Sequence, residues 1–433
     1  MARRRPGTKI EQPPHAVTQA APQGATVPSE SPSENPILQQ TDLLRLADQC
    51  VKCGFCLPHC PTFRLYRDEA ESPRGRIALI QGLLAGQLRD GQQLATHLDN
   101  CLECRACEPA CPSLVQFGML MDGARAERVA RQPRWRRFAV RLRLDLLSNP
   151  HALAPLALLA GLYRRAGPGW LARRLGLLRH PRIRILDGLA RQLRRPTRIT
   201  APPSQADGDA PAVGLFLGCV SRGLQPATAA AALRVMRRLG IVARVPADQV
   251  CCGAMHRHNG HPEAAERRLQ QNRAAFGDAA AVGFSSACVA ELRMGLEAVE
   301  LCRLLIDTDW PANVRPRPLP ALAAVHEPCS HRNLLRDTKA VYALLGRIPG
   351  LDVIALEGND SCCGAAGTYL LERPETATAL AADKVRQLAE RQPRFLLTTN
   401  TGCAAHLAAQ LQAAGLTIEV LHPVELLDRQ LHT

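Results

Sequence analysis

The sequence predicts a multidomain protein in which an α-helical, cysteine-rich domain precedes a duplicated α/β region. Three observations support this fold class. Two four-cysteine runs lie between residues 50 and 111. From about residue 213, short apolar segments alternate with helical ones, which is typical of α/β units. In addition, the adjacent cysteines of "QVCCGAMH" return in "SCCGAAG", so the second half of the chain contains a repeat.

Residues 1–36 are predicted to form a disordered tail. They contain arginines but no apolar signal-peptide core, and they are rich in Pro, Gln, Ala and Ser. We therefore expect a protein that is not exported. The chain has 17 cysteines. Because the cytosol keeps thiols reduced and an odd number cannot pair fully, metal ligation is favoured over a disulfide framework.

Residues 37–124 are predicted to form an α-helical two-cluster ferredoxin domain. Both cysteine runs have the form C-x2-C-x2-C-x3-C-P, in which three thiolates bind one [4Fe-4S] cluster and the fourth turns to the neighbouring cluster. Zinc is disfavoured because it prefers ligands in two separate pairs. The segment between the runs has apolar residues at helical spacing. The predicted ligands are Cys50, Cys53, Cys56 and Cys111 for cluster 1, and Cys101, Cys104, Cys107 and Cys60 for cluster 2.

Two clusters so close in the sequence predict a protein that passes single electrons. The segment "SPRGR" at residues 72–76 places two cations near them, where they would offset the negative charge of thiolate-ligated iron. A helix cap followed by solvated arginines is the alternative interpretation.

Residues 125–208 are predicted to form a basic helical linker. From Arg125 to Arg198 there are 19 arginines against three acidic residues, a net charge of +16. Such a block suits anionic lipid or an acidic partner subunit, with compositional bias towards arginine as the alternative. Nucleic acid is disfavoured because aromatics are few and no known motif is present. The most apolar segment, Ala152 to Tyr163, is too short to span a bilayer and contains Pro155, so a packed or surface-lying helix is expected.

Residues 209–320 and 321–433 are predicted to be two copies of one α/β domain, which we call the first and second CCG domains. Equivalent cysteines are separated by 110, 111 and 115 residues. In each copy they follow predicted strands, at the edge where open α/β sheets gather their ligands. The two sets are Cys219, Cys251, Cys252 and Cys288, and Cys329, Cys362, Cys363 and Cys403.

Each set is a candidate site for a soft metal or a further iron-sulfur cluster, and a redox-active dithiol or a structural turn remains open. The second set is the stronger candidate, because His406 follows Cys403 as C-x2-H and His326 and His331 are near in the sequence. His406 could add an imidazole ligand or a proton acceptor, or it could simply be packed. The first set has Glu291 at the corresponding place. Separately, Cys302 is expected to be an inert core residue.

These motifs resemble the iron-sulfur subunit family of bacterial glycolate oxidase, also called glycolate dehydrogenase, over residues 37–433. The similarity is greatest in "CGFCLPHCPTF", "DNCLECRACEPACPS", "CCGAAGTY" and "TNTGCAAHL". The resemblance implies FAD-binding partner subunits that oxidise glycolate to glyoxylate, with this subunit carrying electrons towards the membrane quinone pool. It also implies that the eight ferredoxin cysteines are cluster ligands. The CCG domains are similar to those of heterodisulfide reductase, whose closing C-x2-C motif is incomplete here.

The expected function is therefore an electron-transfer subunit without catalytic residues of its own. The sequence has no FAD fingerprint and no P-loop, so FAD is expected on partner subunits only. The expected location is cytoplasmic, with peripheral attachment to the inner face of the cytoplasmic membrane. The alternatives are a subunit of a related lactate or glycerol-3-phosphate dehydrogenase, a heterodisulfide-reductase-like thiol enzyme, and a cluster-based redox sensor that binds its partner through the basic block.

Overall fold

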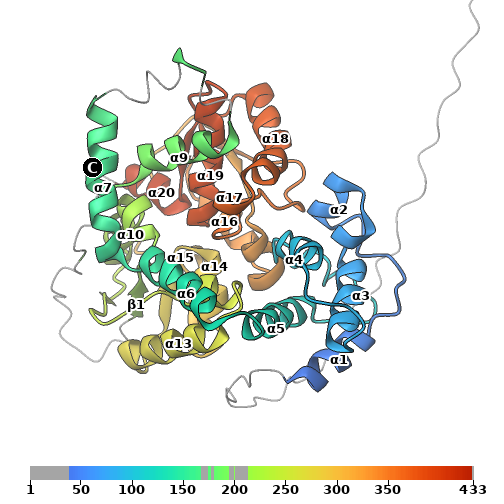
Figure 1. Cartoon of the computed structure of the whole chain (residues 1–433). Helices are drawn as coiled ribbons and strands as arrows, with labels where there is room; N and C mark the ends of the chain where they lie inside the picture. Colours follow the sequence, from blue (N-terminus) through green and yellow to red (C-terminus); the bar gives the residue numbers. More distant parts are fainter. Residues whose placement is uncertain (1–38, 167–173, 177–179, 195–198, 200–212, 432–433) are drawn as a thin grey trace, which may run out of the picture. The chain divides into compact units, whose positions relative to one another are not determined.

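The computed structural model describes residues 39–166, 174–176, 180–194, 199 and 213–431. The predicted tail lies outside this range, as do parts of the predicted linker, while the chain from Asn35 onward forms one compact unit. The predicted fold class is confirmed, because a helical N-terminal part is followed by two similar parallel sheets with helices around them (Figure 1). The exact domain boundaries remain predictions.

Short helices enclose the core of the N-terminal part. They are α1 (Gln40–Asp48), α2 (Pro61–Tyr66), α3 (Pro73–Leu84), α4 (Gln92–Asp99) and α5 (Phe117–Ala130), with a 3-10 turn η1 (Glu69–Glu71). Helix α3 starts at Pro73 because the Ser72 hydroxyl accepts a hydrogen bond from the Gly75 N–H at 2.9 Å. The two cysteine runs occupy the loops between α1 and α2 and between α4 and α5. Helix packing therefore brings two loops that are distant in the sequence to one place.

Three helices of the predicted linker pack against the rest of the unit. They are α6 (Arg134–Ser148), α7 (Pro150–Ala166) and α9 (Pro181–Gln192). Helix α9 lies along α19 (Thr401–Ala413), where a Cβ at Gly188 would be 2.2 Å from the Ala409 Cβ (Figure 1). The glycine therefore permits this close approach. Among the described residues, no helix is both long and apolar enough to cross a membrane.

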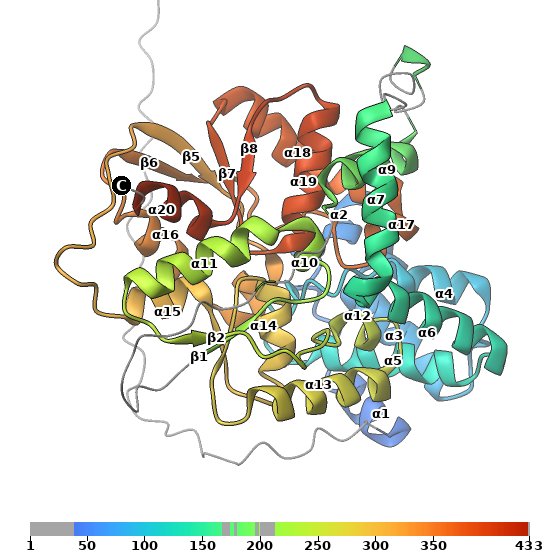
Figure 2. The same ribbon diagram turned by 90° about the vertical axis from the view of Figure 1, so that its left-hand side faces the viewer.

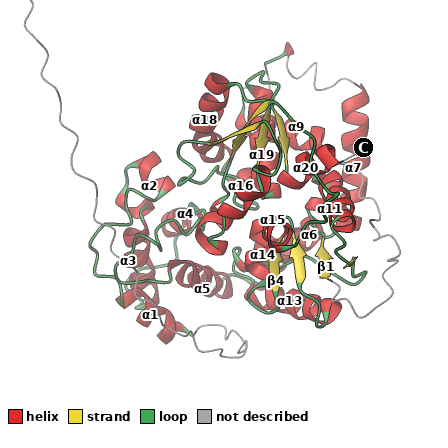
Figure 3. Cartoon of the chain, turned by 180° about the vertical axis from the view of Figure 1, so that it is seen from behind, coloured by secondary structure: helices red, strands yellow, loops and turns green. Residues whose placement is uncertain are grey.

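Each CCG domain contains a four-stranded parallel sheet with the same strand order. The first sheet is β2 (Ala243–Arg244), β1 (Val213–Phe216), β3 (Ala281–Gly283) and β4 (Ala298–Glu300), in spatial order. The second is β6 (Leu351–Ala355), β5 (Ala321–Val325), β7 (Phe395–Leu397) and β8 (Glu419–Leu421), as Figure 2 shows. Figure 3 shows the strands in yellow with helices around them. In each sheet the chain runs from the first strand (β1 or β5) to a neighbour on one side and then crosses to a neighbour on the other side. The strand order therefore reverses beside β1 and beside β5, which is the switch point of each sheet. The sequence predicted three strands per copy and missed the short β4 and β8.

Helices cover both sheets and join the two copies into one apolar core. The first copy contributes α10 (Ser221–Leu224), α11 (Pro226–Arg238), α12 (Ala254–Arg257), α13 (Pro262–Phe276), α14 (Ser286–Leu292) and α15 (Leu301–Asp307). The second contributes the π-helical η3 (Ser330–Leu335), α16 (Lys339–Leu345), α17 (Tyr369–Glu372), α18 (Pro374–Arg391), α19 and α20 (Pro423–Leu431). Leu233 of α11, Leu344 of α16 and Leu427 of α20 belong to the same buried cluster. Cys302 is fully buried in it, as expected for a core residue.

Two contacts between hydroxyl groups join the two copies beside their cysteines, so that the sheet edges carrying the cysteines lie opposite each other. The Ser286 and Ser330 hydroxyls are 2.7 Å apart, and so are those of Ser221 and Thr401. Ser286 and Thr401 each lie two residues before the last cysteine of their set, and the other two follow the first cysteine. The contacts are thus related by the same near-symmetry as the repeat. As a result, both sets of cysteines face the centre of the duplicated region.

Candidate metal centres

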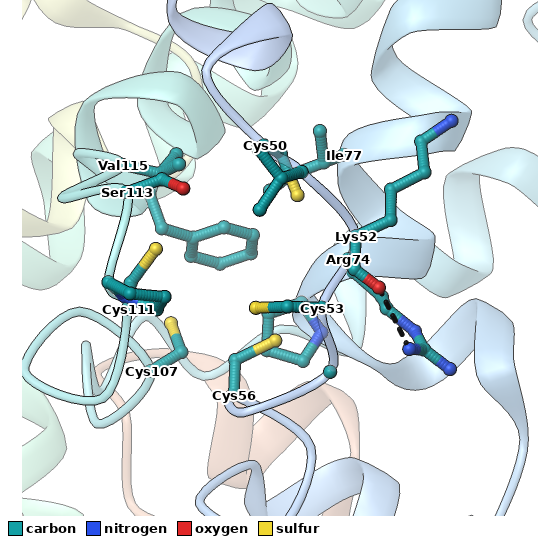
Figure 4. Close-up of a pocket in the computed structure, with 15 residues that line it drawn as sticks. Cys50, Lys52, Cys53, Cys56, Arg74, Ile77, Cys107, Cys111, Ser113 and Val115 are labelled. Carbon is teal, nitrogen blue, oxygen red and sulfur yellow. Dashed lines mark hydrogen bonds between the residues drawn. The ribbon is translucent and has the colours of Figure 1, made fainter.

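The four cysteines predicted to bind cluster 1 line one hollow near the surface. Figure 4 shows Cys50, Cys53, Cys56 and Cys111 around it, with Cys107 at one side. Burial raises the pKa of Cys56 to about 11, and nearby Cys50 and Cys111 add to this effect. Bringing several thiols together is unfavourable for their thiolate forms unless a cation binds among them. The residues therefore fit a cluster, and the assignment of individual ligands remains a prediction.

The cysteines predicted to bind cluster 2 are more deeply buried. Burial raises the pKa of Cys104 and Cys107 well above the usual value, and each of these thiols also interacts with Cys60 and Cys101. Cys60 comes from the first run, so the structure brings the fourth cysteine of one run to the other three of the second. This proximity is compatible with the exchange that the spacing predicts, and the ligand set of cluster 2 stays a prediction.

The two cysteine loops adopt the same unusual backbone conformation. Lys52 and Glu103, each just before the second cysteine of a run, have φ values of 57° and 49°. The residues just after it, Gly54 and Arg105, have φ values of 89° and 53°. Left-handed residues reverse the chain direction locally, which allows the thiols of one loop to point to a common centre.

A buried arginine lies beside the second site. Arg76 is 1% exposed, and its Nη1 is 3.9 Å from the Cys60 Sγ. The guanidinium donates to the Glu71 carboxylate at 2.5 Å and to the Thr62 hydroxyl at 3.0 Å. Arg76 is therefore a fixed positive charge next to cysteines that would carry negative charge when they bind iron. The alternative of solvated arginines holds only for the neighbouring Arg74, which is exposed and pairs with Glu69.

A charged cluster that the sequence did not indicate links the ferredoxin part to the first CCG domain. His258 contacts the carboxylates of Glu103 and Asp122, while Arg125 pairs with Glu103 and donates to the Cys101 carbonyl at 2.8 Å. Burial opposes protonation, but the two carboxylates raise the pKa of His258 well above its usual value. Burial also opposes ionisation of Glu103, yet His258 and Arg125 lower its pKa to about 2. The domains are thus joined by a buried ion network directly behind the second cysteine run.

In the first CCG domain, the four predicted cysteines converge. The Sγ atoms of Cys219 and Cys251 are 3.4 Å apart, and Cys252 interacts with both Cys251 and Cys288. Glu291, which occupies the place of a last ligand in the sequence, instead pairs with Arg257 at 2.7 Å.

The glycine of each CCG motif has a structural reason. Gly253 and Gly364 have φ values of 102° and 91°. Added Cβ atoms would lie 3.0 Å from the Ala265 backbone and 2.6 Å from the Ala377 oxygen. Only glycine fits here, because it allows the adjacent cysteines to turn against the following helix.

The second CCG domain also gathers its four cysteines. The Sγ atoms of Cys329 and Cys362 are 4.0 Å apart, and those of Cys363 and Cys403 are 3.1 Å apart. A nitrogen of His326 lies with the Cys363 and Cys403 sulfurs in a group whose atoms are all within 4.8 Å of one another. Burial lowers the pKa of His326 to about 3, with a smaller effect from a neighbouring lysine, so the imidazole is neutral.

The other two histidines near this site have different partners. The Nε2 of His406 is 3.0 Å from the Ala377 carbonyl, and the Nδ1 of His331 is 2.7 Å from the Thr399 hydroxyl. The orientation of α19 directs the Nε2 of His406 towards α18, while its Nδ1 is buried without a hydrogen bond among the described residues. The choice between a ligand and a packed histidine therefore stays a prediction for His406.

The ferredoxin part and the second CCG domain meet at their cysteines. After burial, negative charge on Cys329 further raises the pKa of Cys104, and charge on Cys104 adds to the raised pKa of Cys362. Cys104 also belongs to the same buried cluster as Cys362 and Cys363. In addition, the Asn333 side chain donates to the Cys104 carbonyl at 2.7 Å. The structure thus gives a continuous series of thiols from the surface hollow to the second CCG domain.

Both CCG cysteine sets border one large cavity of about 1400 Å³. Cys219 and Cys288 of the first set and Cys329 and Cys403 of the second line it. Helices α5, α6, α7 and α9 contribute mostly apolar side chains to its other walls.

Comparison with protein families agrees with this division of the chain. Residues 46–115 match the family described as "4Fe-4S dicluster domain". Residues 213–293 and 323–408 both match the family described as "Cysteine-rich domain". The chain therefore carries iron-sulfur clusters and a duplicated cysteine-rich region.

Relatives of similar length are iron-sulfur subunits. The chain is 30% identical over 406 residues to the "Glycolate oxidase iron-sulfur subunit" of Escherichia coli (strain K12), covering 88% of this chain and 93% of the relative. It is 27% identical over 418 residues to the "Probable glycolate oxidase iron-sulfur subunit" of Bacillus subtilis (strain 168), covering 87% and 92%. "Lactate utilization protein A" of Shouchella clausii (strain KSM-K16) is 27% identical, but over only 50% of this chain. These relatives support an iron-sulfur electron-transfer subunit of an oxidase or dehydrogenase.

Proposed function

Because this chain belongs to the family of the glycolate oxidase iron-sulfur subunits, we propose that it accepts electrons from an FAD-binding partner that oxidises glycolate to glyoxylate, and that it passes them towards a quinone. The observation that supports this most is the order of the cysteine sites. An open hollow, a buried site and the second CCG site follow one another. Cys107 lines the hollow and interacts with the thiols of the buried site, and Cys104 of the buried site interacts electrostatically with Cys329. Bound iron-sulfur clusters supply transfer of single electrons.

The hollow of cluster 1 is a suitable place for electrons to enter. Cys53 is exposed, and three apolar side chains around it, Val51, Phe55 and Leu114, are more than 60% exposed. Exposed apolar patches of this kind are typical of protein interaction sites. We therefore assign this face to the flavoprotein partner, whose FAD would come close to cluster 1.

The large cavity is a suitable place for the acceptor. Its volume exceeds the roughly 300–1,000 Å³ of usual small-molecule pockets. Leu153 of α7, Leu189 of α9 and Met255 of α12 are among its apolar walls, and the cysteines of the second CCG set border it. A lipophilic quinone ring matches this lining better than a charged acceptor does.

Helix α6 supports peripheral attachment to the inner face of the cytoplasmic membrane. Trp135, Phe138, Leu142 and Leu146 recur at helical spacing on its outer side and are between 45% and 71% exposed. The opposite side packs inward through Leu144 and Ser148. Exposed arginines flank the apolar stripe, Arg134 on one side and Arg136 on the other. An apolar face bordered by arginines is the pattern of helices that lie in the headgroup region of anionic bilayers.

The proposal is tested by purifying the complex from its native host and reducing it with substrate. We expect flavoprotein subunits to co-purify and glycolate to bleach the visible absorbance of the clusters. A Cys104→Ser variant should keep glycolate-dependent reduction of a dye at the flavin but lose quinone reduction. Recovery without any flavoprotein would refute the electron-transfer role and favour a redox sensor.

The substrate is settled with the same complex. Glycolate, D-lactate and glycerol 3-phosphate are compared as donors, and glycolate should be the best of them. Lactate is the second candidate, because "Lactate utilization protein A" relatives match about half of this chain. Faster cluster reduction by D-lactate than by glycolate would overturn the assignment.

A further inference from the structure

We infer that His326 is an imidazole ligand of a metal centre in the second CCG domain, which it shares with Cys363 and Cys403. The inference deepens the proposed function and rests on it in one respect: such a centre would lie between cluster 2 and the acceptor cavity. The ligand role itself depends only on the residues around His326.

The first observation is a buried imidazole whose ring nitrogens are not fully hydrogen-bonded. His326 follows strand β5 and is 1% exposed. Among the described residues, neither its Nδ1 nor its Nε2 makes a hydrogen bond of normal geometry, and the side chain of Asn359 interacts with the ring more weakly. Buried polar atoms are nearly always hydrogen-bonded, and one amide can satisfy only one of the two ring nitrogens, so the other nitrogen needs an explanation. A bound ion is one of the few that fit.

The second observation is the position of the ring. One of its nitrogens and the Sγ atoms of Cys363 and Cys403 lie within 4.8 Å of one another, and all three residues are buried. Small movements would bring these atoms to the distances of about 2.0–2.3 Å at which nitrogen and sulfur bind metals such as zinc. Two thiolates with one imidazole suit zinc or the iron of an iron-sulfur centre. The other two thiols of the set, Cys329 and Cys362, are 4.0 Å apart and would complete the coordination.

The first CCG domain provides an internal comparison. The residue three positions before its first cysteine, which corresponds to His326, is Phe216. Phe216 is buried and its ring packs against Phe276, with the centroids 6.2 Å apart. The first copy therefore offers no imidazole at this point, while its four thiols still converge. The difference predicts that only the second copy has a mixed sulfur and nitrogen centre.

His406 serves as the matched control. It is as deeply buried as His326 and stands in the C-x2-H spacing that sequence alone would select. Its Nε2, however, is hydrogen-bonded to the Ala377 carbonyl, and its ring is not in the group with the two thiols. Replacing it should disturb packing without removing a ligand.

The test compares the wild type with His326→Phe and His406→Phe variants of the full chain, purified without oxygen. Iron, zinc and acid-labile sulfide are counted per chain, and pulsed EPR measures nitrogen hyperfine coupling. We expect the wild type to hold metal beyond the about eight irons of two [4Fe-4S] clusters. The His326→Phe variant should lose that metal and any nitrogen coupling to it, and the His406→Phe variant should keep both.

One further variant makes the outcome decisive. A His326→Gly variant is prepared with and without imidazole, and recovery of the metal by imidazole supports ligation even where the Phe variant folds poorly. Zinc in place of iron would support the ligand role but remove the centre from the electron path, which separates the two proposals. The inference is overturned where the wild type holds no metal beyond the two clusters, or where the extra metal survives in His326→Phe.

Discussion

Binding of α6 to lipid can be tested by removing its two exposed aromatic side chains. Trp135 is 71% exposed and Phe138 is 66% exposed. Fully burying one large apolar side chain contributes about 1.5–3 kcal/mol. Burying the exposed two-thirds of both rings therefore contributes about 3 kcal/mol to bilayer binding. The Trp135→Ser, Phe138→Ser double variant should then partition about a hundredfold more weakly, because about 1.4 kcal/mol corresponds to a factor of ten.

The assay is co-sedimentation of the purified protein with vesicles that contain anionic lipid. Leu88→Ser is the matched control, since Leu88 is 41% exposed but lies after α3 and outside the basic block. An Arg134→Gln, Arg136→Gln variant should weaken binding by about 1 kcal/mol per charge at low salt and by less at high salt. Equal binding of the wild type and the aromatic variant would refute the reasoning. So would protection of Trp135 by the flavoprotein in the absence of lipid, which would make the stripe a subunit interface.

Three other predictions concern the clusters and the duplicated region. Cys53→Ser and Cys104→Ser should each remove about four irons, and unchanged iron in both would refute the ligand assignment. Burial raises the pKa of Glu300 from 4.5 to about 7, so its share of stability is present below pH 4.5 and is lost as the pH rises through 7. Glu300→Gln should therefore increase the free energy of unfolding at pH 8 by up to about 3 kcal/mol, and with it Tm, but have little effect at pH 5. Glu297→Gln, at an exposed position, is the control. A gain in stability that does not depend on pH would contradict this explanation. Gly364 has a φ of 91° and no room for a Cβ, so Gly364→Ala should lower Tm and the metal content of the second CCG domain. An unchanged Tm would show that the turn can relax.

The parts of the fold that depend on local signals were predictable from the sequence. The cysteine runs have a fixed spacing, so both the helical ferredoxin domain and the grouping of Cys60 with the second run could be anticipated. The repeat predicted two similar sheets, and the structure has them. Strands β4 and β8 were missed because, unlike the equally short β3 and β7, neither leads to a cysteine of the repeated sets, which was the signal used to place the strands.

The parts that depend on tertiary contacts were not predictable in this way. His326 precedes its first cysteine by three residues, and only the turn after β5 brings it to Cys363 and Cys403. His258 joins Glu103 across more than 150 residues, and no spacing signals such a pair. The stripe on α6 could have been found, because Trp135 and Phe138 recur at helical spacing, but the arginine count drew attention to charge alone.

The near-symmetry of the duplicated region makes the differences between its halves informative. The contacts Ser286–Ser330 and Ser221–Thr401 set the two cysteine edges against one cavity in equivalent positions. Any chemical difference between the sites must therefore come from individual side chains. In the first copy, Phe216 replaces the imidazole.

The second copy differs in its surroundings as well as in its ligands. It has His326, and it is the copy whose Cys329 meets Cys104 of the ferredoxin part. In the first copy, by contrast, Glu291 is held by Arg257, and His258 is committed to the ion network with Glu103. The proposed path of electrons therefore runs through the second copy. The first copy is expected mainly to close the cavity and to hold the ferredoxin part in place. Replacing its Cys251 should therefore lower Tm while leaving the rate of quinone reduction nearly unchanged.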